Sequence, residues 1–262
     1  MQINMKNTVK IMWILNITPD SFFDGWNFNS FDNAKNQIEK MIEEWVDIID
    51  IGWFSSRPGF VLPTVEEELK RIIPILDLLE KYNIDFSVDT CRSEVVGKII
   101  KYKNLIYIND ISWLADENIL NIIENTNIWY ILMHTNTISN PQYLDVVKEV
   151  WDFFEEKLKI INKYKIKNII LDVWFWFWKN IKHNYDLLKN LNYFQKFNLE
   201  ILVWLSRKSM MYKFLDSNPQ DVLEETVALN LLALNNWADI LRVHDIKKNK
   251  NIIKIFNLMN NL

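Results

Sequence analysis

The sequence has 262 residues, and 49% of them are hydrophobic, so the chain is long enough to bury one large core. Its formal net charge of −4 argues against a nucleic-acid-binding surface. A single cysteine, Cys91, leaves no basis for an internal disulfide framework or a thiolate metal cluster and is typical of the reducing cytoplasm. The N-terminal apolar segment is too short to span a membrane and lacks a signal-peptide cleavage pattern, so we expect a cytoplasmic protein that binds neither nucleic acid nor membrane.

Short apolar segments alternate along the chain with longer amphipathic ones. The short segments predict strands at 10–15, 47–51, 84–89, 106–109, 130–134, 168–172, 201–204 and 239–243. The longer segments have apolar residues three and four positions apart and predict helices at 31–45, 65–82, 92–102, 117–125, 143–164, 181–193, 219–236 and 245–258. Eight strands, each followed by a helix, predict an α/β fold that is a single (β/α)8 TIM barrel, with residues 1–262 as one domain.

Polar side chains gather at or just beyond the carboxyl ends of these predicted strands. In a (β/α)8 barrel those ends converge on the face that carries the active site. A helix cap explains any one such residue, but it explains a whole ring of them poorly. The ring consists of Asn16, Asp89, Asn109, His134, Asp172, Ser206, Lys208, Arg242 and His244.

Eight segments in chain order resemble the motifs of dihydropteroate synthases and span nearly the whole sequence. They are ILNITPDSFFDGWNF (14–28), DIGWFSSRPG (50–59), VDTCRSEV (88–95), INDIS (108–112), LMH (132–134), LDVWFWFWKN (171–180), LVWLSRKSM (202–210) and ADILRVHD (238–245). The resemblance implies a transferase of folate biosynthesis. It would condense 6-hydroxymethyl-7,8-dihydropterin diphosphate with 4-aminobenzoate and release diphosphate.

The resemblance also implies which residues hold the flat, polar pterin ring. Asp172 would accept hydrogen bonds from the amino-pyrimidine edge, and Arg242 would stack its guanidinium group on the ring face. The catalytic set implied is Asp89, Asp172, Lys208, Arg242 and His244, and the pterin-binding set is Asp89, Asn109, Met133, Asp172, Phe177, Lys208 and Arg242.

For the other substrate groups, the resemblance implies a magnesium ion held by the side-chain oxygen of Asn16. Ser206 would bind the carboxylate of 4-aminobenzoate, together with backbone groups and a helix that begins near Arg207. The residues implied for the diphosphate and 4-aminobenzoate are Ser55, Ser56, Arg57, Ser206, Arg242 and His244. The family pattern further implies a homodimer formed by helices late in the barrel.

Tryptophan and glycine contents are unusual, with 12 tryptophans and only 4 glycines against a typical glycine content of about 7%. Nine tryptophans stand where the family pattern has glycine, Trp45 is a tenth candidate, and the alignment of Trp129 and Trp151 stays open. Because indoles at tight turns would be costly, we hypothesise that the gene uses UGA codons for glycine that the printed sequence gives as tryptophan. The alternative is a degenerate, inactive paralogue. The nine are Trp13, Trp26, Trp53, Trp113, Trp174, Trp176, Trp178, Trp204 and Trp237.

Several interpretations stay open. Two rival functions are a related pterin-binding barrel that transfers a methyl group from a folate to a corrinoid, and a non-catalytic pterin-binding barrel. Val173 departs from the proline usual in the family at that position. His134 is either a site residue or a core histidine, His183 is expected at the surface, and Cys91 is expected to be a buried, unreactive side chain.

Overall fold

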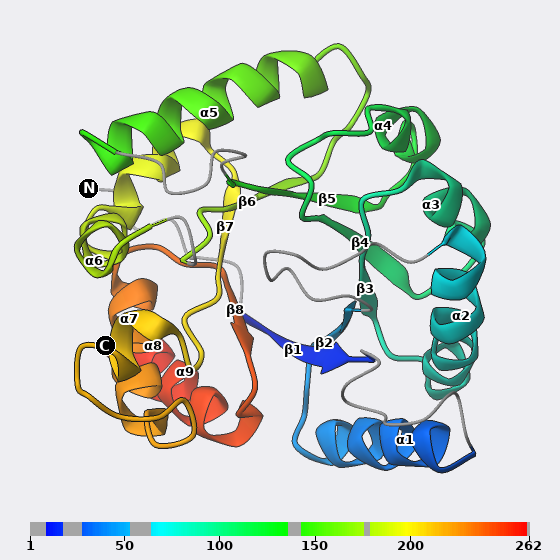
Figure 1. Ribbon diagram of the computed structural model, residues 1–262, viewed down its shortest axis with the longest axis horizontal. Coiled ribbons are helices and arrows are strands. Elements are labelled where there is room, and N and C mark those ends of the chain that lie inside the picture. The colour runs from blue at the N-terminus through cyan, green and yellow to red at the C-terminus, as the bar shows by residue number, and fades with distance from the viewer. Residues whose placement is uncertain (1–8, 18–27, 53–63, 136–142, 176–178, 261–262) are drawn as a thin grey trace. The chain divides into compact units, whose positions relative to one another are not determined.

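All eight predicted strands are present and close into a barrel in the order β1-β2-β3-β4-β5-β6-β7-β8 (Figure 1). The structure, a computed structural model, describes residues 9–17, 28–52, 64–135, 143–175 and 179–260. Every strand pair whose register is described runs parallel. The expected (β/α)8 architecture is therefore confirmed.

The strands are short, and β2, β3, β6 and β8 are buried along their whole length, as expected for parallel strands covered on both faces. The strand bounds are β1 Lys10–Asn16, β2 Ile48–Gly52, β3 Phe86–Asp89, β4 Leu105–Asp110, β5 Trp129–Met133, β6 Ile169–Asp172, β7 Glu200–Val203 and β8 Ile240–Val243. The helix bounds are α1 Phe28–Glu43, α2 Val65–Tyr82, α3 Ser93–Ile99, α4 Asn118–Ile123, α5 Val146–Ile161, α6 Ile181–Lys189, η2 Leu191–Phe197, α7 Ser209–Tyr212, α8 Leu223–Asn235 and α9 Ile246–Asn260.

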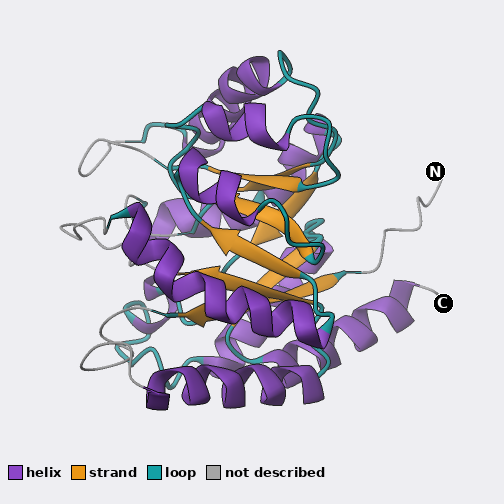
Figure 2. Ribbon diagram, turned by 90° about the vertical axis from the view of Figure 1, so that its right-hand side faces the viewer, coloured by secondary structure: helices purple, strands orange, loops and turns teal. Residues whose placement is uncertain are grey.

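By their internal contacts the residues form two compact units. The first unit comprises Met1–Met12, His134–Glu156 and Ile170–Leu262, and the second comprises Trp13–Met133 and Lys157–Ile169. Within the second unit α2, α3 and α4 follow one another along the strands, and within the first α8 lies beside α9 (Figure 1). In each unit the helices lie outside the strands (Figure 2). The single domain expected from the sequence stays a prediction.

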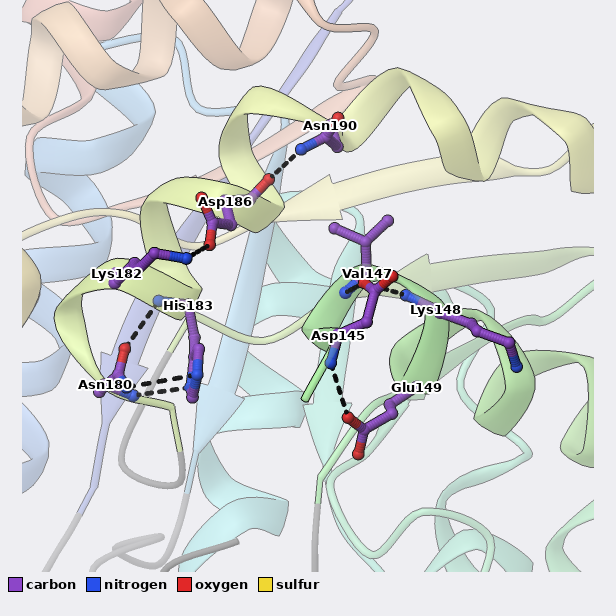
Figure 3. Close-up of polar contacts among 9 residues, drawn as sticks. All are labelled: Asp145, Val147, Lys148, Glu149, Asn180, Lys182, His183, Asp186 and Asn190. Carbon is purple, nitrogen blue, oxygen red and sulfur yellow. Dashed lines mark hydrogen bonds and ion pairs between the residues drawn. The ribbon is translucent and has the colours of Figure 1, made fainter. Parts of the chain in front are cut away.

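The starts of α2, α5 and α6 are fixed by local side-chain caps. Thr64 and Glu67 form a capping box at α2, and Asn180 and His183 form one at α6 (Figure 3). The carboxylate of Asp145 accepts from the first amides of α5 in the same way (Figure 3). The expectation of a surface position for His183 is thus only partly right, because its half-buried ring belongs to this cap.

The structure departs from the predicted helices mainly at two places. The helix expected over 181–193 ends at Lys189, and a separate 3-10 helix, η2, follows it. The one-turn helix α7 was not expected, because four residues are too few to show a helical period. Among the described helices, none is both long and apolar enough to cross a membrane.

Candidate active site

The second unit contributes a row of residues at the carboxyl ends of β2, β3 and β4. Strand register pairs Gly52 with Asp89 and Asp89 with Asn109. Asn109 is buried and donates from Nδ2 to Asp50 Oδ2 at 3.3 Å. Its Oδ1 has no hydrogen-bond partner among the described residues. Leaving a buried acceptor unsatisfied is costly, so this oxygen suits a donor from a ligand.

Gly52 leaves room for oxygen atoms beside the β2 backbone. A β-carbon at this position would lie 3.2 Å from Asn16 Oδ1 and 3.8 Å from Asp89 Oδ2. Asn16 is the exposed last residue of β1. Among the described residues, no cluster of three or more His, Cys, Asp or Glu side chains is arranged as a metal site. The Gly52 gap is instead a small oxygen-lined cradle that suits a hard cation.

The loop that follows Asp89 is anchored to α2. Thr90 Oγ1 donates to buried Glu68 Oε1 at 2.7 Å, and Arg92 Nη1 lies 3.4 Å from Glu68 Oε2. Burial, followed by nearby carboxylates, raises the pKa of the Cys91 thiol to about 12. Cys91 is therefore no thiolate nucleophile, as expected, although its side chain is only half-buried.

The first unit contributes three buried charged side chains at the ends of β6, β7 and β8, namely Asp172, Lys208 and Arg242. Burial raises the pKa of Asp172 to about 6, while Trp174 N, Arg242, Lys208 and Lys179 act in the opposite direction. Burial, and then the charge of Arg242, lowers the pKa of Lys208 well below its ordinary value. Charges held this far from water are costly, and such perturbed clusters are typical of functional sites.

Two indoles lie among these cations. Lys208 Nζ is 3.2 Å from the ring centroid of Trp204 and 4.6 Å from that of Trp174. Arg242 Cζ lies 4.3 Å from the Trp204 centroid. Lys208 and Arg242 therefore both lie against the indole of Trp204, and both side chains are placed to face an aromatic ring.

The loops after β7 and β8 are joined by two pairs of polar contacts. His244 Nδ1 lies 3.1 Å from Ser206 Oγ, and Arg207 reaches both carboxylate oxygens of Asp245 at 3.1 and 3.2 Å. Burial and three neighbouring cations lower the pKa of His244 to about 3, so its imidazole is neutral at pH 7. The helix expected near Arg207 begins later, at Ser209, and Arg207 itself has a left-handed φ of 56°.

The structure places the remaining predicted residues as follows. Met133 is the buried last residue of β5. His134 is a buried histidine whose ring lies 4.8 Å from that of Phe153, which favours the core interpretation. Ser55, Ser56, Arg57 and Phe177 lie outside the described residues.

Sequence reasoning missed Lys179. Its ammonium is buried beside His134 and the backbone that follows Asp172. A lysine between a predicted strand end and a helix cap is ordinarily read as a solvated charge. The signal available was its position, because it directly follows the aromatic segment after β6 and directly precedes the cap residue Asn180.

The sequence matches the family described as pterin binding enzyme over residues 12–244. The dihydropteroate synthase of Escherichia coli strain K12 is 38% identical over 253 residues, which cover 94% of this chain and 89% of that protein. The dihydropteroate synthase of Bacillus subtilis strain 168 is 33% identical over 264 residues, which cover 99% of this chain and 91% of that protein.

Solved structures of the same kind superpose over nearly all of the chain. A dihydropteroate synthase from Clostridium difficile, solved in the presence of pteroic acid, has a TM-score of 0.90 and 32% identity, covering 98% of this chain and 99% of that one. The enzyme of Xanthomonas albilineans with 4-aminobenzoic acid has a TM-score of 0.90 and 30% identity, covering 98% and 94%.

Proposed function

The chain belongs to the pterin-binding enzyme family, and we propose that it works as a dihydropteroate synthase. Two sets of residues carry this proposal, one at the ends of β2, β3 and β4 and one at or after the ends of β6, β7 and β8, and we call each set a half-site. It is a transferase that joins 6-hydroxymethyl-7,8-dihydropterin diphosphate to 4-aminobenzoate, giving 7,8-dihydropteroate and diphosphate in folate biosynthesis. The observation that carries this function is the buried trio of Asp172, Lys208 and Arg242 at the strand ends of the first unit.

Each half-site offers groups that match a pterin edge or face. Asp172 is the proposed acceptor for the amino-pyrimidine edge, and Lys208 is the proposed donor to ring acceptors. Asn109, with its unsatisfied buried Oδ1, and the adjacent Asp89 would pair further ring atoms. Arg242 would stack on the ring face, as it does here on the indole of Trp204.

For the diphosphate, we propose a magnesium ion bound through Asn16 Oδ1, supported by the oxygen-lined gap beside Gly52. When bound, the ion would supply charge compensation for the leaving diphosphate. Arg242 would add a second positive charge. Because its pKa is depressed, His244 would contribute a neutral N–H donor rather than a cation.

The chemistry follows a dissociative path. The C–O bond between the pterin methylene and the diphosphate breaks, and its electron pair leaves on the diphosphate. The amine nitrogen of 4-aminobenzoate then donates its lone pair to the methylene carbon, and the surplus proton passes to solvent. An arylamine is already nucleophilic, so no strong general base is required. Ser206, now engaged with His244, would have to turn its hydroxyl to bind the 4-aminobenzoate carboxylate.

We propose that tryptophan replaces glycine in the printed sequence only. Four described tryptophans have left-handed backbone angles: Trp45 at φ 64°, Trp113 at 55°, Trp174 at 52° and Trp237 at 76°. A β-carbon in this region costs about 1–2 kcal/mol per residue, whereas glycine adopts it freely.

Helix ends give the sharpest support for glycine. After α1, Val46 N donates to Met41 O, and after α8, Ala238 N donates to Ala233 O. These bonds define Schellman motifs, in which the left-handed position normally holds glycine. Here that position holds Trp45 or Trp237, whose side chains are 81% and 42% exposed, so burial offsets the strain least at Trp45.

The same replacement would clear the cation-lined half-site. Removing the indoles of Trp174 and Trp204 would leave Lys208 and Arg242 facing open space of the width of a flat ring. The codons provide a direct test. Twelve UGA codons would support the proposal, and a UGG codon at Trp45 or Trp237 would overturn it.

Function is tested by diphosphate release from the pterin diphosphate, measured with and without 4-aminobenzoate and with and without magnesium. The protein as printed is compared with a variant carrying glycine at all twelve tryptophan positions. Turnover that needs 4-aminobenzoate, in the glycine variant alone, would support both proposals. Turnover in neither protein would favour the non-catalytic barrel, and methyl transfer from a folate to a corrinoid would favour the methyltransferase.

We further propose a cytoplasmic homodimer. Exposed apolar side chains on the last two helices support the dimer, namely Leu232 of α8 and Ile255, Leu258 and Met259 of α9. The single cysteine supports the compartment. Sedimentation of the glycine variant would show one subunit mass if the dimer proposal is wrong.

A further inference from the structure

Lys179 is a buried ammonium group that binds the backbone immediately after Asp172. Its Nζ donates to Val173 O at 3.2 Å and to Trp174 O at 2.8 Å, and its side chain is almost wholly buried. Main-chain carbonyls make these two bonds, so they persist whichever side chain stands at position 174. The two carbonyls follow Asp172 directly, and the ammonium therefore fixes the chain that carries this carboxylate.

His134 completes the arrangement from β5. Its Nδ1 lies 2.9 Å from Lys179 Nζ, and its backbone amide donates to Asp172 O at 2.8 Å. Burial lowers the pKa of Lys179 to about 7, so below that pH the group is an ammonium with donors only. In that state His134 accepts at Nδ1 and carries its proton on Nε2. His134 thus holds the backbone carbonyl of Asp172, and Lys179 holds the carbonyls of the two residues that follow it.

The start of α6 keeps Lys179 in place. Asn180 caps the helix, with His183 N donating to Asn180 Oδ1 at 2.8 Å (Figure 3). The buried side chain of Asn184 donates to Lys179 O at 3.1 Å. The lysine is therefore held at its own backbone as well as at its ammonium.

A purely structural role is the plainer alternative. Burying an ammonium is expensive, and an apolar side chain of similar length would fill the space more cheaply. What an apolar side chain would lack is the pair of carbonyl bonds and a positive charge near Asp172. Those two features matter to a carboxylate that must be held in one place and kept ionised.

We infer that Lys179, together with His134, is a positioning residue that orients the carboxylate of Asp172 for pterin recognition. The inference rests on the proposed role of Asp172 in the synthase reaction. Two effects follow from the geometry: a fixed carboxylate position through the Val173 and Trp174 carbonyls, and an electrostatic bias toward the ionised form. The other charged groups that act on Asp172 are Arg242 and Lys208, and both remain when Lys179 is replaced.

The test compares Lys179→Met with Lys182→Met, in the printed and glycine-restored proteins. Lys182 is an exposed lysine of α6 paired with Asp186 at 2.8 Å, so its replacement removes the same charge from the same helix region (Figure 3). For Lys179→Met we expect KM for the pterin diphosphate to rise about 10- to 100-fold, with kcat and KM for 4-aminobenzoate nearly unchanged. Lys182→Met should leave all three constants unchanged.

The pH dependence of kcat/KM distinguishes a role of Lys179 in orienting Asp172 from a role in packing alone. The pKa of Asp172 is about 6 with the ammonium present, and loss of a nearby positive charge raises it further. The acid limb of kcat/KM for the pterin substrate should therefore move to higher pH in Lys179→Met. A lower melting temperature with no shift of this limb, or an equal loss for both substrates, would overturn the inference.

A spectroscopic readout keeps the test independent of turnover. The chain has three histidines, so ¹⁵N-histidine spectra can be assigned with the His183→Gln and His244→Gln variants. We expect His134 to show an unprotonated Nδ1 and a protonated Nε2, with no titration between about pH 5 and pH 8. If no protein turns over but His134 has this signature and loses it in Lys179→Met, the synthase proposal fails while the Lys179–His134 contact stands. If His134 titrates normally in the parent, the inference itself is wrong.

Discussion

The half-site on β2, β3 and β4 is built differently from the half-site on β6, β7 and β8. In the first, strand register alone aligns Gly52, Asp89 and Asn109, and a true glycine leaves the space that oxygen atoms need. In the second, buried charges depend on loop backbones, and indoles occupy the space between the cations. Side chains that strand register aligns keep their positions when a single residue elsewhere is wrong. Side chains held by a loop depend on the backbone conformation of each residue in the turn.

The largest effect on activity should come from a substitution in the half-site on β6, β7 and β8. Asp172→Asn keeps the shape of the side chain but removes the charge and one acceptor. We expect kcat/KM for the pterin diphosphate to fall about 100-fold or more, because a charged hydrogen bond to the ring is replaced by a mismatched donor. Steady-state kinetics would measure it. The isosteric control is Asp152→Asn on the exposed face of α5, and a loss no greater than in this control would contradict the proposed role.

The same residue should set the pH dependence of the glycine-restored enzyme. Burial raises the pKa of Asp172 to about 6, and the ionised form is the one that accepts from the pterin. Activity should therefore be present above pH 6 and fall about tenfold per pH unit below it, because the ionised fraction of the carboxylate falls about tenfold with each unit below its pKa. A profile of kcat/KM against pH would show this limb. A limb near the ordinary aspartate value of about 4 would mean that another group controls binding.

The features of the fold and the site that could be predicted from the sequence are those that leave a local pattern in it. Apolar patterns predicted every strand, and the spacing of apolar residues predicted helix α2 with the bounds that the structure has. The polar residues at the strand ends, such as Asp89 and Asp172, could be predicted as site residues because the carboxyl ends of the strands converge on one face of a barrel.

What sequence could not supply was the partner of each polar group. The bond from Lys179 to His134 joins residues 45 positions apart, and nothing local signals it. The neutral state of His244 likewise depends on burial and on three cations, two of which, Arg207 and Lys208, come from the loop after β7. The one-turn α7 and the break before η2 depend on backbone geometry that has no apolar period.

A smaller effect on activity is expected from a substitution in the half-site on β2, β3 and β4. Gly52→Ala places a β-carbon 3.2 Å from Asn16 Oδ1, so the asparagine must move. We expect the magnesium concentration for half-maximal diphosphate release to rise about tenfold, with little change in the KM for 4-aminobenzoate. Gly97→Ala in α3 is the matched control, because its β-carbon would meet only Ile122 Cδ1 at 3.8 Å. An unchanged magnesium requirement in Gly52→Ala would remove Asn16 from the proposed cation site.

The smallest expected effect is on stability alone, and it tests whether a glycine fits better than a tryptophan at a left-handed position. Trp45 and Asn83 occupy equivalent left-handed positions after α1 and α2. Neither residue is among those proposed to bind a substrate or the magnesium ion. Trp45→Gly should raise the free energy of unfolding by about 1 kcal/mol, because glycine relieves the β-carbon strain and the exposed indole contributes little burial. The reciprocal change, Asn83→Trp, should lower it by a similar amount. Urea denaturation of the two variants and the parent would measure both. If Trp45→Gly is no more stable than the parent while Asn83→Trp is tolerated, a left-handed tryptophan is no burden to this fold, and the steric argument for glycine fails even where the indoles crowd the cations.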